Sequence, residues 1–179
     1  MMSHDLFISY STMDKPTADA VCAALERAGI RCWMAPRDIL PSQIWGEEII
    51  DAIRHSSLMV VVFSSSSNAS AQVLREIERA VSKGIPVLPF RIENVEPTGS
   101  MEYFLATPHW LDAITPPLER HIQRMVGTVE VLLAQEPVGV ERDVPSPTVA
   151  ESVEEIAPDE WYESRGRLGR LFKKLLQDR

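Results

Sequence analysis

Short continuous apolar runs alternate along the chain with stripes of apolar residues spaced three or four positions apart. The continuous runs are typical of strands, and Leu58–Phe63, apolar throughout and rich in β-branched residues, is typical of a strand covered on both faces. Two prolines predict that Ile85–Phe90 is irregular or near a sheet edge. The predicted strands are Leu6–Tyr10, Ile30–Trp33, Leu58–Phe63, Ile85–Phe90 and Trp110–Asp112.

The apolar stripes predict helices between these strands. Asp14 is a candidate cap for the first helix, Pro16 is tolerated in its first turn, and Gly29 ends it. Met34–Gln43 and Ser64–Asn68 are predicted to be loops. Strand and helix alternate through four units, which predicts a parallel, doubly wound α/β sheet. The predicted helices are Asp14–Ala28, Trp45–His55, Ala71–Lys83 and Pro116–Ala134.

Polar side chains follow the first two predicted strands directly. Ser9, Tyr10 and Ser11 lie at the end of the first strand, and Arg37 and Asp38 lie in the loop after the second. In an open parallel sheet, ligands bind just beyond the carboxyl ends of the strands. These residues therefore outline a candidate binding edge.

The composition narrows the classes of protein that fit. With 179 residues, the chain has room for one domain of ordinary size and a tail, and its core needs no disulfides. The net charge of −8 argues against a general nucleic-acid binder, which needs a basic face. Cys22 and Cys32 match no metal or redox spacing and are expected in the core. The first five residues lack a signal-peptide pattern, so we expect a cytoplasmic protein.

The character of the chain changes after Gln135. Residues 136–160 combine four prolines with many acidic residues and few large apolar ones, which predicts a disordered linker. Residues 161–179 carry six Lys and Arg against two acidic residues, a net charge of 6 − 2 = +4, around one apolar helical stripe. A basic amphipathic helix can lie on a membrane surface or in a partner's groove. It can equally pack back on the domain or begin a further one.

Taken in order, these segments resemble a Toll/interleukin-1 receptor (TIR) domain, in particular its bacterial members. The resemblance covers roughly Ser3 to Ala134 and implies a flavodoxin-like fold for residues 1–135. Ser70–Glu76 resembles the start of the helix that carries a catalytic glutamate in enzymatic members. The other matching segments are Phe7–Ser11, Cys32–Ile39 with Pro41 and Trp45 in the long BB loop, Val60–Ser64, and His109–Asp112.

The resemblance implies one of two function classes. Many bacterial members cleave NAD⁺ between nicotinamide and ribose, giving ADP-ribose or cyclised products, and others act only as adaptors through homotypic assembly. The family position makes Glu76 the candidate catalytic residue, whose carboxylate would stabilise an oxocarbenium-like ribose. Helical spacing alone does not choose between Glu76 and Glu78, because both fall on the borders of the apolar face, where a carboxylate is usually solvated.

The remaining candidates would bind NAD⁺ as a substrate, and we expect no metal and no cofactor. Tyr10 and Trp45 could stack on the rings of NAD⁺ or pack against loop residues. Arg37 could hold a phosphate or form a salt bridge with the aspartate beside it. Ser9 and Ser11 could bind ribose or cap a loop turn.

One departure from the family bears on function. Enzymatic members often carry a tryptophan shortly before the glutamate, and Ala71–Val73 stand in that place here. The missing ring supports the adaptor class. In the enzyme class, the resemblance implies that activity needs self-assembly, with the Met34–Gln43 loop of one subunit completing or gating its neighbour's pocket, and that the protein acts in bacterial defence.

Overall fold

The computed structural model describes residues 4–39, 44–106 and 109–134. The predicted linker (136–160) and the predicted basic helix (161–179) lie outside these residues, as do residues 40–43 of the Met34–Gln43 loop. The boundary at residue 135 therefore stays a prediction.

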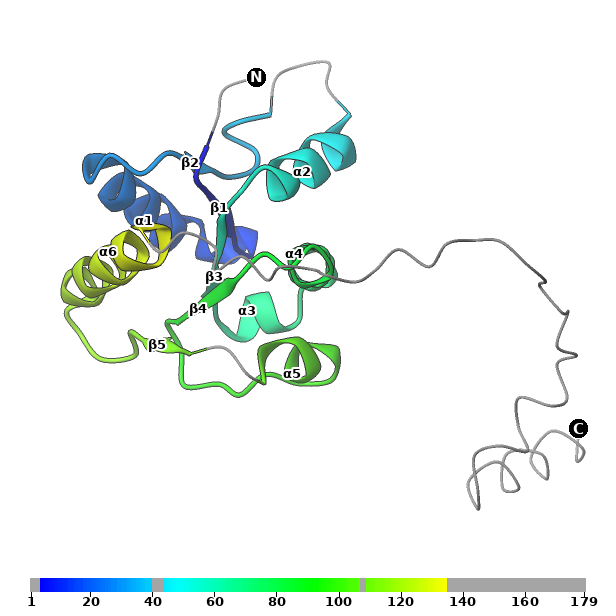
Figure 1. The fold of residues 1–179 in the computed structure, drawn as a ribbon. Coiled ribbons are helices and arrows are strands. Elements are labelled where there is room, and N and C mark those ends of the chain that lie inside the picture. Colours follow the sequence, from blue (N-terminus) through cyan, green and yellow to red (C-terminus); the bar gives the residue numbers. More distant parts are fainter. Residues whose placement is uncertain (1–3, 40–43, 107–108, 135–179) are drawn as a thin grey trace, which may run out of the picture. The chain divides into compact units, whose positions relative to one another are not determined.

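The described residues form one five-stranded sheet in which every pair of neighbouring strands is parallel (Figure 1). The strand order is β2-β1-β3-β4-β5, so the chain runs outward from β1 in both directions. This order confirms the predicted doubly wound, flavodoxin-like sheet. The strands are β1 (Leu6–Ser9), β2 (Cys32–Trp33), β3 (Leu58–Phe63), β4 (Val87–Arg91) and β5 (Leu111–Asp112).

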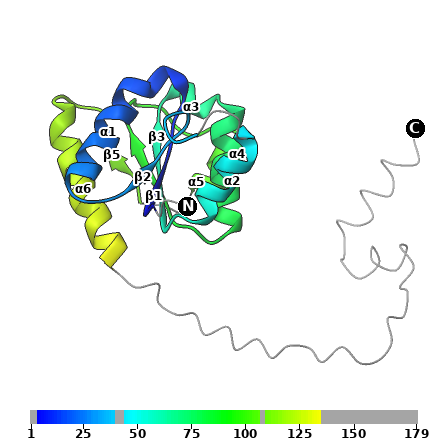
Figure 2. The same ribbon diagram turned by 90° about the horizontal axis from the view of Figure 1, so that it is seen from above.

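Helices cover both faces of the sheet, and the alternation of side chains along β3 explains why (Figure 2). Leu58, Val60 and Val62 belong to the core under α1 and α6, whereas Met59, Val61 and Phe63 belong to the core under α2, α4 and α5. All six are buried, which confirms the prediction of a doubly covered strand. The helices are α1 (Lys15–Arg27), α2 (Trp45–Arg54), α3 (Ser65–Asn68), α4 (Ala71–Ser82), α5 (Ser100–Leu105) and α6 (Leu118–Ala134), with a 3₁₀ turn, η1 (Thr12–Asp14), before α1.

The start and end of α1 agree with the sequence in part. Gly29 follows the helix with φ of 84°, the left-handed conformation that lets glycine end a helix. Asp14 occupies the N-cap position, but its side chain makes no capping bond. The capping prediction is wrong in that respect, because the Asp14 carboxylate instead accepts a hydrogen bond from Ser64. Cys22 and Cys32 are free and buried, as expected for core residues.

Two short helices were not predicted. Ser64–Asn68, predicted to be a loop, contains α3, because Ser64 and Ser67 form a capping box in which each side chain bonds the backbone of the other. A five-residue serine-rich stretch has too little apolar spacing to predict a helix. The second, α5, is held by Met101 and Leu105, which are four residues apart and buried against the sheet.

Pro86 lies just before β4 and Pro89 lies inside it, and the hydrogen bonds between β3 and β4 explain why the strand tolerates Pro89. Met59 donates to the Pro86 carbonyl, and Ile92 donates to the Phe63 carbonyl, so the even-numbered residues of this segment face β3. Pro89 therefore faces the other side, where β5 begins to pair only at Phe90. Pro89 therefore removes no hydrogen bond from the ladder with β3, and β4 is a regular strand next to the edge strand of the sheet.

Candidate functional site

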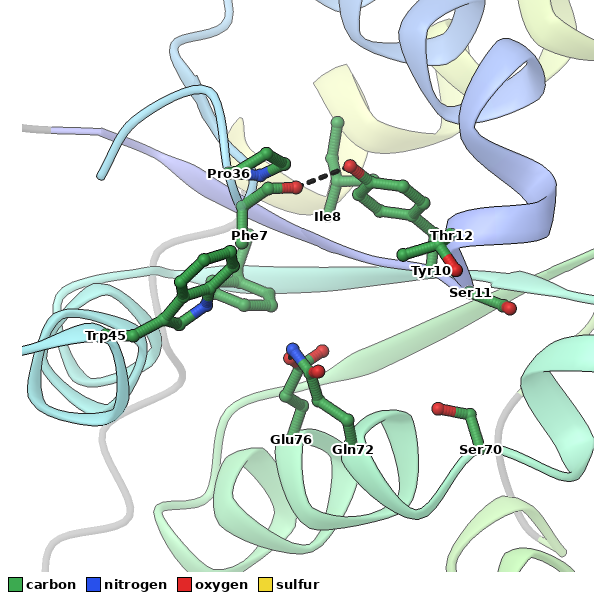
Figure 3. A pocket seen from close by; sticks show the side chains of 11 residues that line it. Phe7, Ile8, Tyr10, Ser11, Thr12, Pro36, Trp45, Ser70, Gln72 and Glu76 are labelled. Atoms are coloured by element: carbon green, nitrogen blue, oxygen red, sulfur yellow. Dashed lines mark hydrogen bonds between the residues drawn. The ribbon is translucent and has the colours of Figure 1, made fainter. Parts of the chain in front are cut away.

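A cavity of about 220 Å³ opens at the carboxyl ends of β1 and β2 (Figure 3). Its walls come from β1 and the residues that follow it, from the start of the Met34–Gln43 loop, from the first residue of α2, and from the N-cap and first two turns of α4. The cavity thus lies at the edge where the sequence predicts a binding site. Its described lining residues are Phe7, Ile8, Tyr10, Ser11, Thr12, Ala35, Pro36, Trp45, Ser70, Gln72 and Glu76.

Glu76 projects from α4 toward this cavity, between Trp45 on one side and Tyr10 on the other (Figure 3). Its carboxylate accepts a hydrogen bond of 2.6 Å from the Ser9 hydroxyl and one of 3.0 Å from the Gln72 amide. Only 6 % of the residue is exposed. Glu76 therefore lacks the solvated surroundings that are usual for a carboxylate at the border of an apolar helix face.

The fold of α4 explains why Glu76 is buried. Ser70 caps the helix by accepting a hydrogen bond from the Val73 backbone N–H, which fixes where the helix begins. The residues buried along it are Val73, Glu76, Ile77 and Ala80, so Glu76 belongs to the stripe that packs inward. Glu78 is exposed. The structure thus separates the two glutamates that helical spacing leaves equivalent.

Burial raises the pKa of the Glu76 carboxyl above its ordinary value, because the charged form loses its water. The hydrogen bonds from Ser9 and Gln72 act in the opposite direction, since both donors stabilise the charged form. No other lining residue described in the structure is an acid or a base of the Asp, Glu, Lys, Arg or His type. The cavity therefore has one ionisable carboxyl group, held by neutral donors.

The two aromatic candidates both line the cavity. The Tyr10 hydroxyl donates a hydrogen bond to the Ala35 carbonyl in the Met34–Gln43 loop (Figure 3), and burial raises the pKa of this hydroxyl. Trp45 is the first residue of α2 and is 53 % exposed. Tyr10 therefore contacts a loop residue and also faces the cavity, while a large part of the Trp45 ring is free to contact a ligand.

The two serines differ. Ser9 is buried and bonds Glu76, and it is absent from the described lining. Ser11 lines the cavity and also accepts a hydrogen bond of 3.4 Å from the Met13 backbone N–H, which caps η1. The loop-capping alternative is thus realised by Ser11, whereas Ser9 supports the carboxylate.

Arg37 neither lines the described cavity nor forms a hydrogen bond with Glu76. Its guanidinium donates to the carboxylates of Asp38 and Glu26, to the Cys32 carbonyl and to the Cys22 sulfur, at distances between 2.7 and 3.0 Å. The salt bridge with Asp38 is thus present, and the phosphate-binding alternative has no support from the geometry. These bonds hold the start of the Met34–Gln43 loop against α1 and β2.

Sequence reasoning missed several lining residues. Gln72 stands one helical turn before Glu76, a spacing that places two side chains on the same face, and this signal was available. Ala35 and Pro36 lie in a loop already assigned to the binding edge. Phe7 and Ile8 lie inside β1 and carried no signal beyond their place in a strand.

Two other kinds of site were sought in the part of the chain that the structure describes. No three His, Cys, Asp or Glu residues there are close enough to hold a metal ion. None of the described helices combines the length and the apolar character that crossing a bilayer requires.

The fold and the position of the cavity define a flavodoxin-like α/β domain with a polar site at the carboxyl edge of its sheet. The family model for the TIR domain matches residues 6–126, well over half of the chain. The chain therefore belongs to the TIR domain family. No curated protein matches it.

Solved structures support the fold. The TIR domain of the Toll-related receptor TRR-2 from Hydra magnipapillata is 24 % identical with a TM-score of 0.60, and the match covers 72 % of this chain and 98 % of that domain. TIR domains of the activated Roq1 resistosome, which recognises the pathogen effector XopQ, are 19 % identical with a TM-score of 0.61, covering 71 % and 99 %. A TIR-STING receptor from C. gigas is 20 % identical with a TM-score of 0.55, covering 75 % of this chain and 42 % of that one.

Proposed function

We propose that this TIR domain cleaves NAD⁺ between nicotinamide and ribose. The observation that carries the proposal is the carboxylate of Glu76, buried to 94 % and placed in the wall of a cavity between two aromatic side chains. In this reaction the C1′–N1 bond breaks, nicotinamide leaves as a neutral molecule with the bonding electrons, and positive charge develops on the ribose. Water then attacks C1′ and loses a proton, giving ADP-ribose, or a nitrogen of the adenine closes a cyclic product.

Glu76 suits the charge that this transition state develops. The leaving group needs no proton, so the protein's task is to stabilise a cation rather than to supply an acid. A carboxylate held in place by two hydrogen bonds costs little reorganisation when charge appears beside it. Tyr10 and Trp45 offer flat surfaces for a flat heterocycle.

The size of the cavity supports a role for assembly. Pockets that hold a drug-sized ligand measure about 300–1,000 Å³, so 220 Å³ accommodates one end of a dinucleotide and leaves the rest outside. Ala35 and Pro36 of the Met34–Gln43 loop form part of the wall. We therefore propose that the loop is both the self-association surface and a gate, so that a neighbouring subunit completes the site.

The biological role proposed here is the one that the family resemblance implies. NAD⁺ is the substrate, and no metal or resident cofactor takes part. The protein would act in the cytoplasm in bacterial defence signalling, and residues 136–160 and 161–179 would tether it to a partner protein or a membrane surface.

An NAD⁺ consumption assay with product analysis tests this function. The purified 179-residue chain should consume NAD⁺ with a rate per subunit that rises with protein concentration, because assembly completes the site. Glu76→Ala and Glu76→Gln should remove turnover, while Glu78→Gln, on the exposed side of the same helix, should retain it. Turnover that survives both Glu76 changes would remove the assignment.

A non-enzymatic interaction module is the second candidate. Gln72 lies in the cavity wall, in the three-residue stretch where enzymatic members often carry a tryptophan. No Lys or Arg lines the described part of the cavity to meet a phosphate. Assembly that proceeds while NAD⁺ stays intact at high protein concentration would favour this candidate.

A further inference from the structure

Within the described part of the chain, two groups donate hydrogen bonds to the Glu76 side chain, and neither is a backbone group. It is the sixth residue of α4, so the free backbone N–H groups of the first turn and the positive end of the helix dipole lie too far along the helix to serve it. Its carboxylate depends on the Ser9 hydroxyl and the Gln72 amide. These bonds decide where its oxygens point and how readily it stays charged.

Gln72 and Ser9 hold different oxygens of the carboxylate. Ser9 donates to Oε2, and Gln72 donates to Oε1. The Ser9 bond, at 2.6 Å, has the length of a charge-assisted hydrogen bond to a carboxylate. Two donors on two oxygens fix the plane of the carboxylate, whereas either donor alone leaves it free to turn about its terminal torsion.

Gln72 can be substituted without disturbing the core, whereas Ser9 cannot. Ser9 is 1 % exposed and lies in a strand, so its role cannot be separated from the core around it. Gln72 is the second residue of α4 and is exposed, and its side chain bonds only Glu76 among the residues that the structure describes. Helix geometry brings it there, because residues four apart lie one above the other and side chains lean toward the helix N-terminus.

We propose that Gln72 is a positioning residue, which orients the Glu76 carboxylate in the cavity and favours its charged form. This inference deepens the proposed function and rests on it for its kinetic consequence. This role differs from that of a tryptophan in this stretch, because Gln72 would supply a hydrogen bond to Glu76 and no aromatic ring. Gln72 acts through Glu76 and touches no reacting atom.

Other charged groups near α4 do not supply this effect. The elements that pack against α4 are β1, β4, α2, α3 and α5. None of their charged side chains bonds Glu76 among the described residues, and the pKa of Glu76 is set by its burial and by the hydrogen bonds from Ser9 and Gln72. The charged residues on these elements and on α4 itself are Glu47, Glu48, Asp51, Arg54, Arg75, Glu78, Arg79, Arg91 and Glu102.

The first test needs no substrate. The full chain is labelled with ¹³C at the glutamate carboxyl carbons and titrated by NMR, and the Glu76 signal is identified by its absence in Glu76→Gln. In Gln72→Met, which keeps the length of the side chain but removes the donor, Glu76 should titrate at a higher pH than in the wild type. Gln123→Met on α6, a matched exposed glutamine, should leave it unchanged.

The second test uses turnover. Gln72→Met should reduce kcat for NAD⁺ at neutral pH about tenfold, the effect of losing one hydrogen bond to a charged group, with a smaller change in KM. The acid limb of its pH profile should move to higher pH. Gln72→Lys, which restores a donor to Glu76, should return that limb to lower pH, which a merely structural role would not do.

The two tests separate failure of the inference from failure of the proposed function. If the wild type leaves NAD⁺ intact while Glu76 titrates later in Gln72→Met, the hydrolase assignment fails and the positioning role stands. If Glu76 titrates identically in the wild type and in Gln72→Met, the positioning role is overturned whatever the turnover. Gln72 is exposed, so these variants are expected to fold.

Discussion

Asp14 and Glu76 are two buried carboxylates near the carboxyl edge of the sheet, and their surroundings are closely alike. Each is less than a tenth exposed, and each accepts a hydrogen bond of 2.6 Å from a serine hydroxyl that follows or ends a central strand. Burial raises the pKa of both carboxyl groups. By burial and electrostatics alone, either residue is a candidate for function.

The cavity separates them. Glu76 belongs to its wall and has a second donor on its other oxygen, whereas Asp14 is absent from the described lining and joins η1 to the end of β3. The comparison teaches that a perturbed pKa marks a buried carboxylate, and that only access to a ligand makes it a site.

The largest expected effect concerns turnover. Glu76→Gln should lower NAD⁺ turnover by about 100-fold or more, the loss typical when a group that stabilises transition-state charge is removed. Asp14→Asn keeps an acceptor for Ser64 and should keep turnover within about threefold, since Asp14 is absent from the described lining of the cavity. Both are measured as kcat/KM on protein whose circular dichroism matches the wild type. Equal losses in the two variants would erase the distinction.

The second effect concerns stability. Asp14→Ala should lower the free energy of unfolding by about 1–3 kcal/mol, because the buried Ser64 hydroxyl loses its acceptor. Asp14→Asn should lose much less, which makes it the matched control. Urea denaturation with an unchanged m-value gives both numbers. A full loss in Asp14→Asn would mean that the charge, rather than the hydrogen bond, stabilises the end of β3.

The spacing of apolar residues predicted the long strands and helices of the fold. The strand Leu58–Phe63 was predicted to the residue, and α2 begins at Trp45 as expected and ends one residue early. The features missed are short ones, such as the single turn of α3, in which hydroxyl bonds rather than apolar spacing make the helix.

The geometry of the candidate site depends on contacts between residues far apart in the chain. Glu76 was identified by its family position, but its hydrogen-bond donor Ser9 lies 67 residues earlier in the chain, and no local pattern predicts that contact. Arg37 failed as a cavity residue because Glu26, on α1, competes for its guanidinium across 11 residues. The predicted topology places residues at the carboxyl edge of the sheet. The hydrogen-bond partner of each side chain depends on how the helices and strands pack, which local sequence does not show.

A third prediction concerns pH. Because burial raises the pKa of Glu76 in the folded state above the ordinary value of 4.5, the folded state holds this proton more tightly than the unfolded state does. The contribution to stability is therefore fully present below pH 4.5 and is lost as the pH rises through the folded-state pKa. Glu76→Gln has no such proton, so its Tm relative to the wild type should increase from acid to neutral pH.

Thermal unfolding of the wild type and Glu76→Gln at a series of pH values measures this difference. Glu78→Gln is the control, because Glu78 is exposed on the same helix and makes no contact with the cavity. A Tm difference that stays constant across pH would show that ionisation of Glu76 does not destabilise the folded protein.

The smallest expected effect belongs to Arg37. Its side chain is 40 % exposed, and exposed ion pairs contribute about 0–1 kcal/mol, so Arg37→Met should lower the free energy of unfolding by about 1 kcal/mol. Part of this comes from the Cys32 carbonyl, which loses a donor. Arg54→Met is a fitting control, because among the described residues Arg54 pairs with Asp51 alone, at a longer distance of 3.2 Å.

Kinetics on the same variants distinguish the two roles considered for Arg37. If its guanidinium held a phosphate of NAD⁺, Arg37→Met would raise KM strongly and leave the free energy of unfolding unchanged. If it anchors the loop, limited proteolysis should cut Arg37→Met faster within Met34–Gln43, because the bonds to α1 and β2 are gone. Glu26→Gln removes one of those anchors from the other side without touching the loop, so it should loosen the same segment in the same direction. A phosphate-binding role predicts no such agreement between the two variants.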